Sequence, residues 1–166
     1  MERVENMKIG MAVTAMLLAL TVAAPARARS AGSQDEKAIA EAMSRYTAAL
    51  EAGPSGVATL AGSFAPDGEL LEPGMESLRG PEAVRKFLEP LAAAVTVRDA
   101  AMTSETIEVH GDTAYQWGHY SQKAEMKGQP AALYQGRFVT EWVRLKGAWK
   151  IRRLLVQPTP QSGGAS

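Results

Sequence analysis

The sequence predicts an α+β domain in which helices come first and an antiparallel sheet follows. Between residues 33 and 94, apolar side chains recur at intervals of three and four, which is the spacing of amphipathic helices. From Val95 to Gln157, apolar and polar residues instead alternate in runs separated by turns that contain glycine, as in antiparallel strands. Helices followed by a block of strands are typical of α+β folds rather than of alternating βαβ units.

Composition limits the classes of protein to which the chain can belong. Of its 166 residues, 46% are hydrophobic and 22% are charged, which suits one globular domain. Lys and Arg number 18 and so do Asp and Glu, so no net charge favours binding to nucleic acid or to an anionic membrane. The sequence has no cysteine, which excludes disulfides, zinc–thiolate sites and thiol nucleophiles.

The N-terminus has the features of a secretory signal peptide, which we expect over residues 1–28. Met7-Lys8 precedes an apolar run, Ile9 to Ala24, that at 16 residues is shorter than the roughly 20 needed by a membrane-spanning helix. Cleavage is expected after Ala26 or Ala28, where small residues have the required spacing. These features predict an exported protein, periplasmic or extracellular, with no stable membrane anchor after cleavage. An uncleaved N-terminal anchor is the alternative.

The first predicted helix carries a start signal and a stop signal. Ser33 and Glu36 match a capping box, and the apolar positions that follow them continue to Leu50. Gly53-Pro54 closes this helix. A short second helix is predicted over residues 57–60.

A short strand and a third helix complete the first half of the chain. Phe64 leads into a predicted turn at Pro66-Asp67-Gly68, and a short strand is predicted over residues 69–72. Gly80-Pro81 opens the third helix, because proline suits the first helical position. Pro90 is expected to bend or shorten this helix.

Four strands are predicted to follow as an antiparallel meander. They cover residues 95–109, 113–124, 131–145 and 148–157. The predicted domain therefore runs over residues 33–157. The remaining residues, 158–166, are rich in Pro, Gly and Ser, and we expect them to form a flexible tail.

The last two strands are expected to form a hairpin with one aromatic face. A two-residue loop at Lys146-Gly147 is expected to place Trp142 opposite Trp149. Further along, Phe138 is expected to lie opposite Arg153, and paired residues project to the same side of a sheet. Arg153 is therefore predicted to point inward, at the far end of the aromatic face.

The strand predicted over residues 113–124 is bulky on both sides. Tyr115, Trp117 and His119 share one of its faces, and Tyr120 lies on the other. A strand with two apolar faces suggests that something covers the outside of the sheet, and a homodimer is the expected arrangement.

Five motifs occur in one order along the chain. They are Tyr46-Thr47-Ala48-Ala49-Leu50, Phe64-Ala65-Pro66-Asp67-Gly68, Leu78-Arg79-Gly80-Pro81-Glu82-Ala83-Val84, Gly111-Asp112-Thr113-Ala114 and Gly147-x-Trp149-Lys150-Ile151. Together they resemble the SnoaL-like branch of the nuclear transport factor 2-like superfamily, over roughly Ala38 to Gln157. The resemblance implies a cone-shaped α+β barrel, in which a strongly curved sheet wraps a long N-terminal helix. It also implies a pocket at the open end and, commonly, dimerisation across the sheet.

The same resemblance leaves the chemistry open, because the superfamily includes steroid isomerases, polyketide cyclases, epoxide hydrolases, dehydratases and members that only bind. Many enzymatic members place an Asp or His on the last strand, a few residues after the tryptophan. Residues 152–157 contain neither. The acid or base usual at that position is therefore missing from this chain.

Candidates for acid–base catalysis are weak. Asp67 lies in a predicted turn, Asp99 lies on the first long strand, and Tyr120 lies on the second. His110 and His119 lack the spacing of metal ligands, so we expect no metal site. No phosphate loop or dinucleotide fingerprint is present, and no cofactor is expected.

The residues expected to bind a ligand are aromatic or polar side chains assigned to the inside of the fold. They are Tyr46, Phe64, Gln116, Tyr120, Phe138, Trp142, Trp149 and Arg153. An aromatic pocket in which Gln116 and Arg153 orient a carbonyl or carboxylate predicts an exported protein that binds a small apolar or amphipathic molecule.

Two alternatives remain open from the sequence. The first is a cofactor-independent lyase, isomerase or cyclase that uses Asp67 or Asp99 with Tyr46 or Tyr120. The second is a partner-binding domain that uses the outer face around Trp117.

Overall fold

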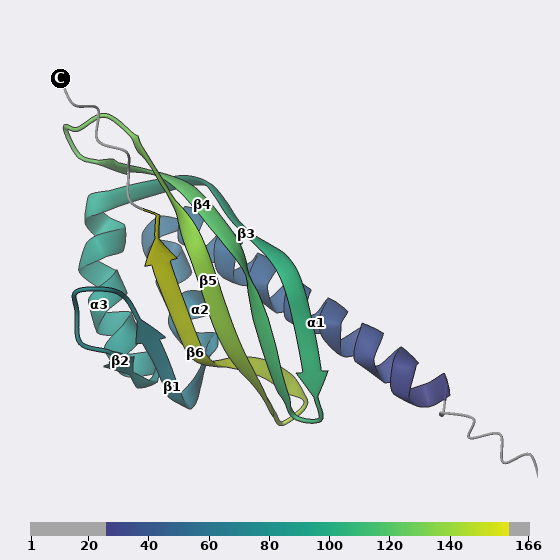
Figure 1. Cartoon of the computed structure of the whole chain (residues 1–166). Coiled ribbons are helices and arrows are strands. Elements are labelled where there is room, and N and C mark those ends of the chain that lie inside the picture. Colours follow the sequence, from purple (N-terminus) through teal and green to yellow (C-terminus); the bar gives the residue numbers. More distant parts are fainter. Residues whose placement is uncertain (1–25, 160–166) are drawn as a thin grey trace, which may run out of the picture.

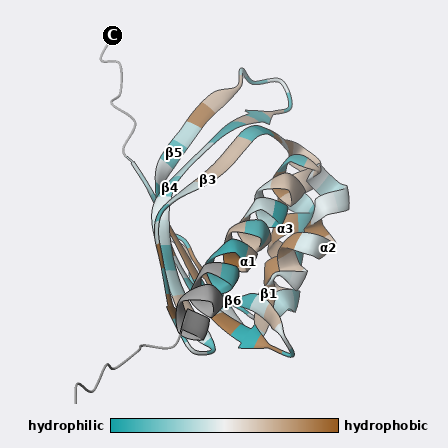
Figure 2. Cartoon of the chain, turned by 90° about the vertical axis from the view of Figure 1, so that its right-hand side faces the viewer, coloured by the Kyte–Doolittle hydropathy of each residue, from teal (hydrophilic) through white to brown (hydrophobic). Residues whose placement is uncertain are grey.

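The computed structural model describes residues 26–159, with side chains from residue 34 onward. Its helices pack against the concave face of one curved sheet (Figures 1 and 2). The helical elements are α1 (Ala26–Glu51), the 3-10 turn η1 (Gly53–Gly56), α2 (Val57–Gly62) and α3 (Gly80–Ala94). None of the helices in this part of the chain is both long and apolar enough to span a membrane. The expected signal peptide up to residue 25 and the expected tail from residue 160 lie outside the described residues.

The structure tests the predicted starts of two helices. The helix α1 begins at Ala26, so Ser33 and Glu36 lie inside it and the predicted capping box is wrong. The helix α3 begins at Gly80 as predicted and continues through Pro90 to Ala94. Burial of the apolar face of α3 outweighs the backbone hydrogen bond that proline removes.

The sheet has six strands in the described residues, in the order β2-β1-β6-β5-β4-β3. They are β1 (Phe64–Leu71), β2 (Leu78–Arg79), β3 (Val95–His110), β4 (Thr113–Met126), β5 (Ala132–Leu145) and β6 (Ala148–Pro158). The last four form the predicted antiparallel meander, with bounds within two residues of those expected. The sheet is curved and stays open between β2 and β3, which confirms the cone-shaped α+β fold.

The strand β1 is longer than predicted. It pairs in parallel with β6, and its register shifts between Phe64 and Glu69. The Pro66-Asp67-Gly68 segment, expected as a turn, lies inside this irregular stretch of strand. The segment is therefore part of β1 instead of a separate turn before the strand, and it bulges away from β6, because Phe64 pairs with Ile151 while Glu69 already pairs with Arg153.

Bulges in β3 bend the sheet around α1. The register of β3 against β4 shifts at residues 99–100 and again at residue 105, and Asp99 has a φ of 52°. A bulge bends its strand and increases the local twist. On the neighbouring strand, a Cβ at Gly118 would lie 2.0 Å from the Thr103 carbonyl oxygen. The absence of a side chain at Gly118 therefore allows the backbones of β3 and β4 to lie close together at this bend.

The hairpin between β5 and β6 has the predicted loop but a different pairing. Lys146 and Gly147 both have positive φ, 50° and 81°, as in a two-residue type I′ turn. Trp149 pairs with Arg144, and Trp142 pairs with Ile151. The expected Trp142–Trp149 pair is therefore wrong, although a shift of two residues leaves both tryptophans on the inner face.

A bulge in β6 turns Arg153 outward. The register shifts next to Glu141, so that Arg153 pairs with Glu141, and Phe138 pairs with Val156 instead of Arg153. Because side chains alternate between faces, one extra residue reverses the face of every residue beyond it. The expected inward position of Arg153 is wrong: 54% of its side chain is exposed, and it forms ion pairs with Glu141 and Glu69.

The core lies between the helices and the more strongly buried part of the sheet. Its members include Ile39, Met43, Phe64, Val84, Leu88, Phe138, Trp142, Ile151 and Leu154. Within it, the Trp142 indole N–H donates to Gln116 Oε1 at 2.9 Å, and Gln116 Nε2 donates to Ser104 Oγ at 2.6 Å. Gln116 therefore accepts the hydrogen bond of the buried Trp142 indole N–H, which would otherwise lack a partner.

Candidate functional site

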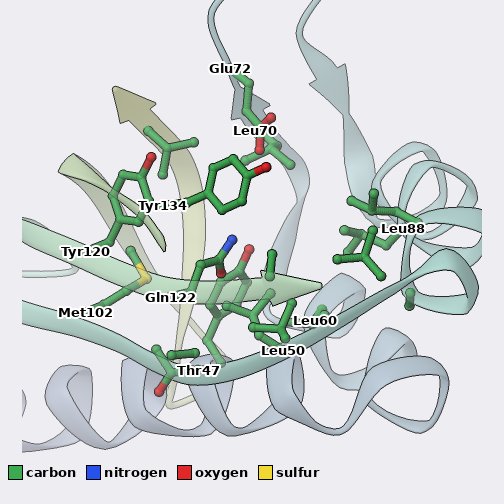
Figure 3. Close-up of a pocket in the computed structure, with 18 of the residues that line it drawn as sticks. Thr47, Leu50, Leu60, Leu70, Glu72, Leu88, Met102, Tyr120, Gln122 and Tyr134 are labelled. Atoms are coloured by element: carbon green, nitrogen blue, oxygen red, sulfur yellow. The ribbon is translucent and has the colours of Figure 1, made fainter. Parts of the chain in front are cut away.

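A cavity of about 440 Å³ opens between α1, α3 and the inner face of the sheet (Figure 3). Most of its lining is apolar and includes Leu50, Leu60, Leu70, Phe87, Leu88, Leu91, Val95, Val97, Met102, Leu154 and Val156. The polar side chains of the lining are Tyr46, Thr47, Glu72, Tyr120, Ser121, Gln122 and Tyr134. A concave, mostly apolar space with a few converging polar groups is the usual form of a small-molecule site.

Helix and strand periodicity explain which residues reach the cavity. Tyr46 and Leu50 are four residues apart on α1 and so lie on one face of that helix. Tyr120, Gln122 and Ala124 alternate with outward residues along β4 and so lie on its inner face. Small side chains such as that of Ala124 leave the space open.

Glu72 is the acidic residue of this lining. It follows the last residue of β1 and is half-buried beside Leu70. Burial raises the pKa of the Glu72 carboxyl, because the charged form loses solvation. Figure 3 shows Glu72, Tyr120 and Tyr134 projecting into the same part of the cavity from three different strands or strand ends.

The negative charge of Glu72 affects the pKa values of two tyrosines in the lining. Tyr46 is buried and packs edge to face on Phe64, with ring centroids 6.4 Å apart. Burial, and then the negative charge of Glu72, raise the pKa of the Tyr46 phenol, and the same two causes raise the pKa of Tyr120. Both phenols therefore stay neutral near pH 7 and keep an O–H that can donate a hydrogen bond.

The structure separates the residues predicted to bind a ligand into two groups. Tyr46 and Tyr120 line the cavity. Phe64, Gln116 and Phe138 are buried in the core and do not line it.

Trp142 and Trp149 lie elsewhere. Both are buried and border a second, smaller hollow of about 240 Å³, which Arg45 and Lys150 also line. The amine of Lys150 donates to the Gly62 carbonyl at 2.5 Å. With Arg153 on the outer face, six of the eight predicted residues do not line the large cavity.

The carboxylates proposed from the sequence also lie outside the cavity. The Asp67 side chain is 64% exposed and lies 3.3 Å from Arg152. The Asp99 side chain is 68% exposed at its bulge and lies 2.7 Å from Lys123, whose hydrogen bond lowers the pKa of Asp99. Neither carboxylate is part of the cavity lining.

Sequence reasoning missed Glu72, although a signal for it was present. In a strand over residues 69–72, Leu70 shares a face with Glu72 and Leu71 shares the other face with Glu69, so a carboxylate accompanies whichever leucine is buried. The structure buries Leu70, and this places the Glu72 carboxyl beside the core.

The histidines lie on the outer surface. His119 Nε2 is 2.5 Å from Glu105, which also binds Arg137 at 2.6 Å. His110 Nε2 lies 3.8 Å from Glu108. Over the residues that the structure describes, no group of three or more His, Asp or Glu side chains is arranged to hold a metal ion.

Comparison with known proteins gives a family and a fold. The sequence profile of the SnoaL-like domain matches residues 32–154. No curated protein matches the chain significantly.

Several solved structures are similar to the chain. A ketosteroid isomerase-like protein from Erwinia carotovora atroseptica has a TM-score of 0.67 and 15% identity, over 75% of this chain and 96% of its own. A conserved protein from Planctomyces limnophilus has a TM-score of 0.68 and 24% identity, over 76% and 98%. A nuclear transport factor 2-like superfamily protein from Salmonella enterica serovar Typhimurium has a TM-score of 0.64 and 17% identity, over 80% and 96%. At these identities the likeness establishes the fold alone.

Proposed function

We propose that this chain, which belongs to the SnoaL-like domain family, binds a small, largely apolar molecule in the cavity between α1, α3 and the sheet. One observation carries the proposal: a space of about 440 Å³, whose lining is rich in Leu, Val, Met and Phe, remains open beside the buried core. Close packing is the rule in protein interiors, so an open space of this size suggests an occupant.

Native mass spectrometry of the gently purified chain tests this proposal. An added mass that disappears on denaturation is the expected result. Ala124→Trp places an indole in the cavity and should abolish the added mass. Glu125→Trp is the matched control, because Glu125 is the exposed neighbour on the same strand and points to the other face. Two results would contradict the proposal. One is loss of the added mass in both variants. The other is an unmodified chain that shows no added mass, either as purified or after small apolar molecules are added.

A second candidate function, acid–base catalysis without a cofactor, is favoured by the Glu72 carboxyl. Burial raises the pKa of Glu72 and moves it toward the range in which a carboxylate is an effective general base. The neutral hydroxyl of Tyr46 or Tyr120 would donate to the oxygen that gains charge when a proton leaves the carbon beside a carbonyl. The ketosteroid isomerase-like neighbour adds a weak argument from the fold.

Hydrogen exchange at carbon tests the catalytic candidate without a known substrate. Cyclic ketones are incubated with the protein in D₂O, and NMR follows loss of the protons beside the carbonyl. Catalysed exchange that Glu72→Gln abolishes and Glu76→Gln leaves intact supports this function. Exchange no faster than in buffer for every ketone that binds would leave binding as the sole function.

We also propose that the chain forms a homodimer through the outer face of the sheet. Trp117 pairs with Val139, Val139 with Leu155, and Leu155 with Leu71, so these side chains form one row across four strands. Val139 and Leu155 are exposed. We call this set the outer row, and a continuous apolar row on an open sheet face favours association. A different partner protein on the outer row is the alternative.

Export is proposed from the sequence alone. The apolar run Ile9–Ala24 and the small residues after it support a cleaved signal peptide. Cell fractionation followed by N-terminal sequencing would locate the chain and its first residue. Recovery of an uncleaved chain from the cytoplasm would contradict the proposal.

A further inference from the structure

The cavity has acidic and aromatic groups in its lining but no basic side chain. Among the described residues that line it, Glu72 is the single acidic one, and none is Lys, Arg or His. An anionic ligand would have to share a weakly solvated space with the Glu72 carboxylate and find no opposite charge there. The lining therefore disfavours fatty acids, phosphates and other anions.

Glu72 has no counter-charge of its own. None of the ion pairs formed among the side chains of residues 34–159 includes it. Arg79 of the neighbouring strand β2 lies 2.8 Å from Glu69, and Glu69 lies on the opposite face from Leu70 and Glu72. Burial raises the pKa of Glu72, and a cation placed beside the carboxylate would offset that loss of solvation.

Three tyrosine rings share the cavity with this carboxylate. Tyr46 comes from α1, Tyr120 from β4 and Tyr134 from β5, so four separate elements converge on one space (Figure 3). The face of a tyrosine ring attracts a cation, and several rings around one carboxylate form the kind of cage that binds ammonium groups. The rest of the lining is apolar and suits a hydrocarbon body.

We propose that the cavity selects an amphiphilic cation, an apolar molecule with one ammonium group that lies beside Glu72 and the rings of Tyr120 and Tyr134. This inference rests on the proposed binding function and names the charge class of its ligand. The apolar body lies against the leucine, valine and methionine side chains of the lining.

Three probes with one carbon skeleton separate charge from shape: 4-phenylbutylamine, 4-phenylbutan-1-ol and 4-phenylbutyrate. Isothermal titration calorimetry near neutral pH measures the Kd of each. The amine should bind about tenfold more tightly than the alcohol, because it gains both the carboxylate and the rings, and the carboxylate probe should bind most weakly.

Two substitutions test whether Glu72 and Tyr134 cause the preference for the amine. Glu72→Gln should weaken binding of the amine about tenfold and leave binding of the alcohol within about twofold. Tyr134→Leu should weaken amine binding severalfold, and because Tyr134 is exposed the variant is expected to fold. The matched control is Glu76→Gln, which removes an exposed carboxylate from the same loop and should change neither Kd.

The outcomes distinguish the two proposals. An alcohol or a carboxylate probe that binds as tightly as the amine would overturn the selection of cations while leaving small-molecule binding intact. Unchanged amine binding in Glu72→Gln would overturn it equally. Failure of all three probes, together with a chain that carries no added mass in native mass spectrometry, would overturn both.

Discussion

Arg144 on β5 forms an ion pair with Asp35 on α1 and at the same time stacks on a tryptophan. Arg144 Nη2 lies 2.6 Å from Asp35 Oδ2, and its guanidinium carbon lies 4.6 Å from the ring centroid of Trp149. The Trp149 indole N–H is directed at Asp35 Oδ1 at 3.4 Å. The pair therefore joins the N-terminal helix to the β5–β6 hairpin, two segments more than a hundred residues apart.

Asp35→Asn should lower the free energy of unfolding by roughly 1.5–3 kcal/mol, the usual contribution of a hydrogen bond to a charged group. Both side chains of the pair are largely shielded from water, so screening does not remove the effect. Urea denaturation measures the change. Glu36→Gln, at an exposed neighbouring position, is the control and should be close to neutral. Equal stabilities for the two variants would contradict a structural role for the pair.

The same pair predicts a dependence of stability on pH. The hydrogen bond from Arg144 holds the pKa of Asp35 below its usual value, which is about 3.9 in an unfolded chain. The folded state therefore binds the Asp35 proton less readily, and the stabilisation is present above pH 3.9 and is lost as the pH falls through the lowered pKa. The stability difference between the wild-type chain and Asp35→Asn should shrink in acid. A difference that stays constant or grows would show that Asp35 acts without its charge.

Val139→Lys should dissociate the proposed homodimer. Val139 lies in the middle of the outer row and is exposed, so a lysine there would be buried without a partner in the dimer. Dimer affinity should fall about a hundredfold, as measured by sedimentation velocity. Thr96→Lys, an exposed change on the edge strand β3, should leave the dimer intact. A wild-type chain that sediments as a monomer would contradict the proposed homodimer and favour a different partner protein on the outer row.

Gly118→Ala should destabilise the fold by roughly 1–3 kcal/mol, the range for inserting a methyl group where no space exists. A Cβ there would meet the Thr103 carbonyl oxygen at 2.0 Å, and a backbone atom cannot move aside as a side chain does. Thermal unfolding followed by circular dichroism measures the loss. Gly62→Ala is the control, because no atom lies within 4 Å of its Cβ position and α2 is helical there. A Gly118→Ala chain as stable as the control would mean that β3 and β4 can separate at this bend.

Local sequence patterns predicted the elements well. The start of α3 at Gly80-Pro81 and the strands from Val95 onward depend on backbone preferences and on side-chain alternation over a few residues. The Lys146-Gly147 loop follows from the same kind of local rule. Errors appeared where a distant strand decided the outcome: β1 begins at Phe64, which pairs with Ile151 of β6, so the Pro66-Asp67-Gly68 segment is a bulge within the strand.

The sequence by itself determined the fold class, the order of helices and strands, and two residues of the cavity, Tyr46 and Tyr120, because periodicity places them on inner faces. Only the tertiary structure decided the face of Arg153, since a single extra residue in β6 reverses the alternation and no local pattern marks where a bulge forms. It also decided which carboxylate enters the cavity. Glu72 is half-buried there because β1 packs between β2 and β6, the second of which lies far from it in the sequence, and that packing brings its carboxyl beside tyrosines from three other elements.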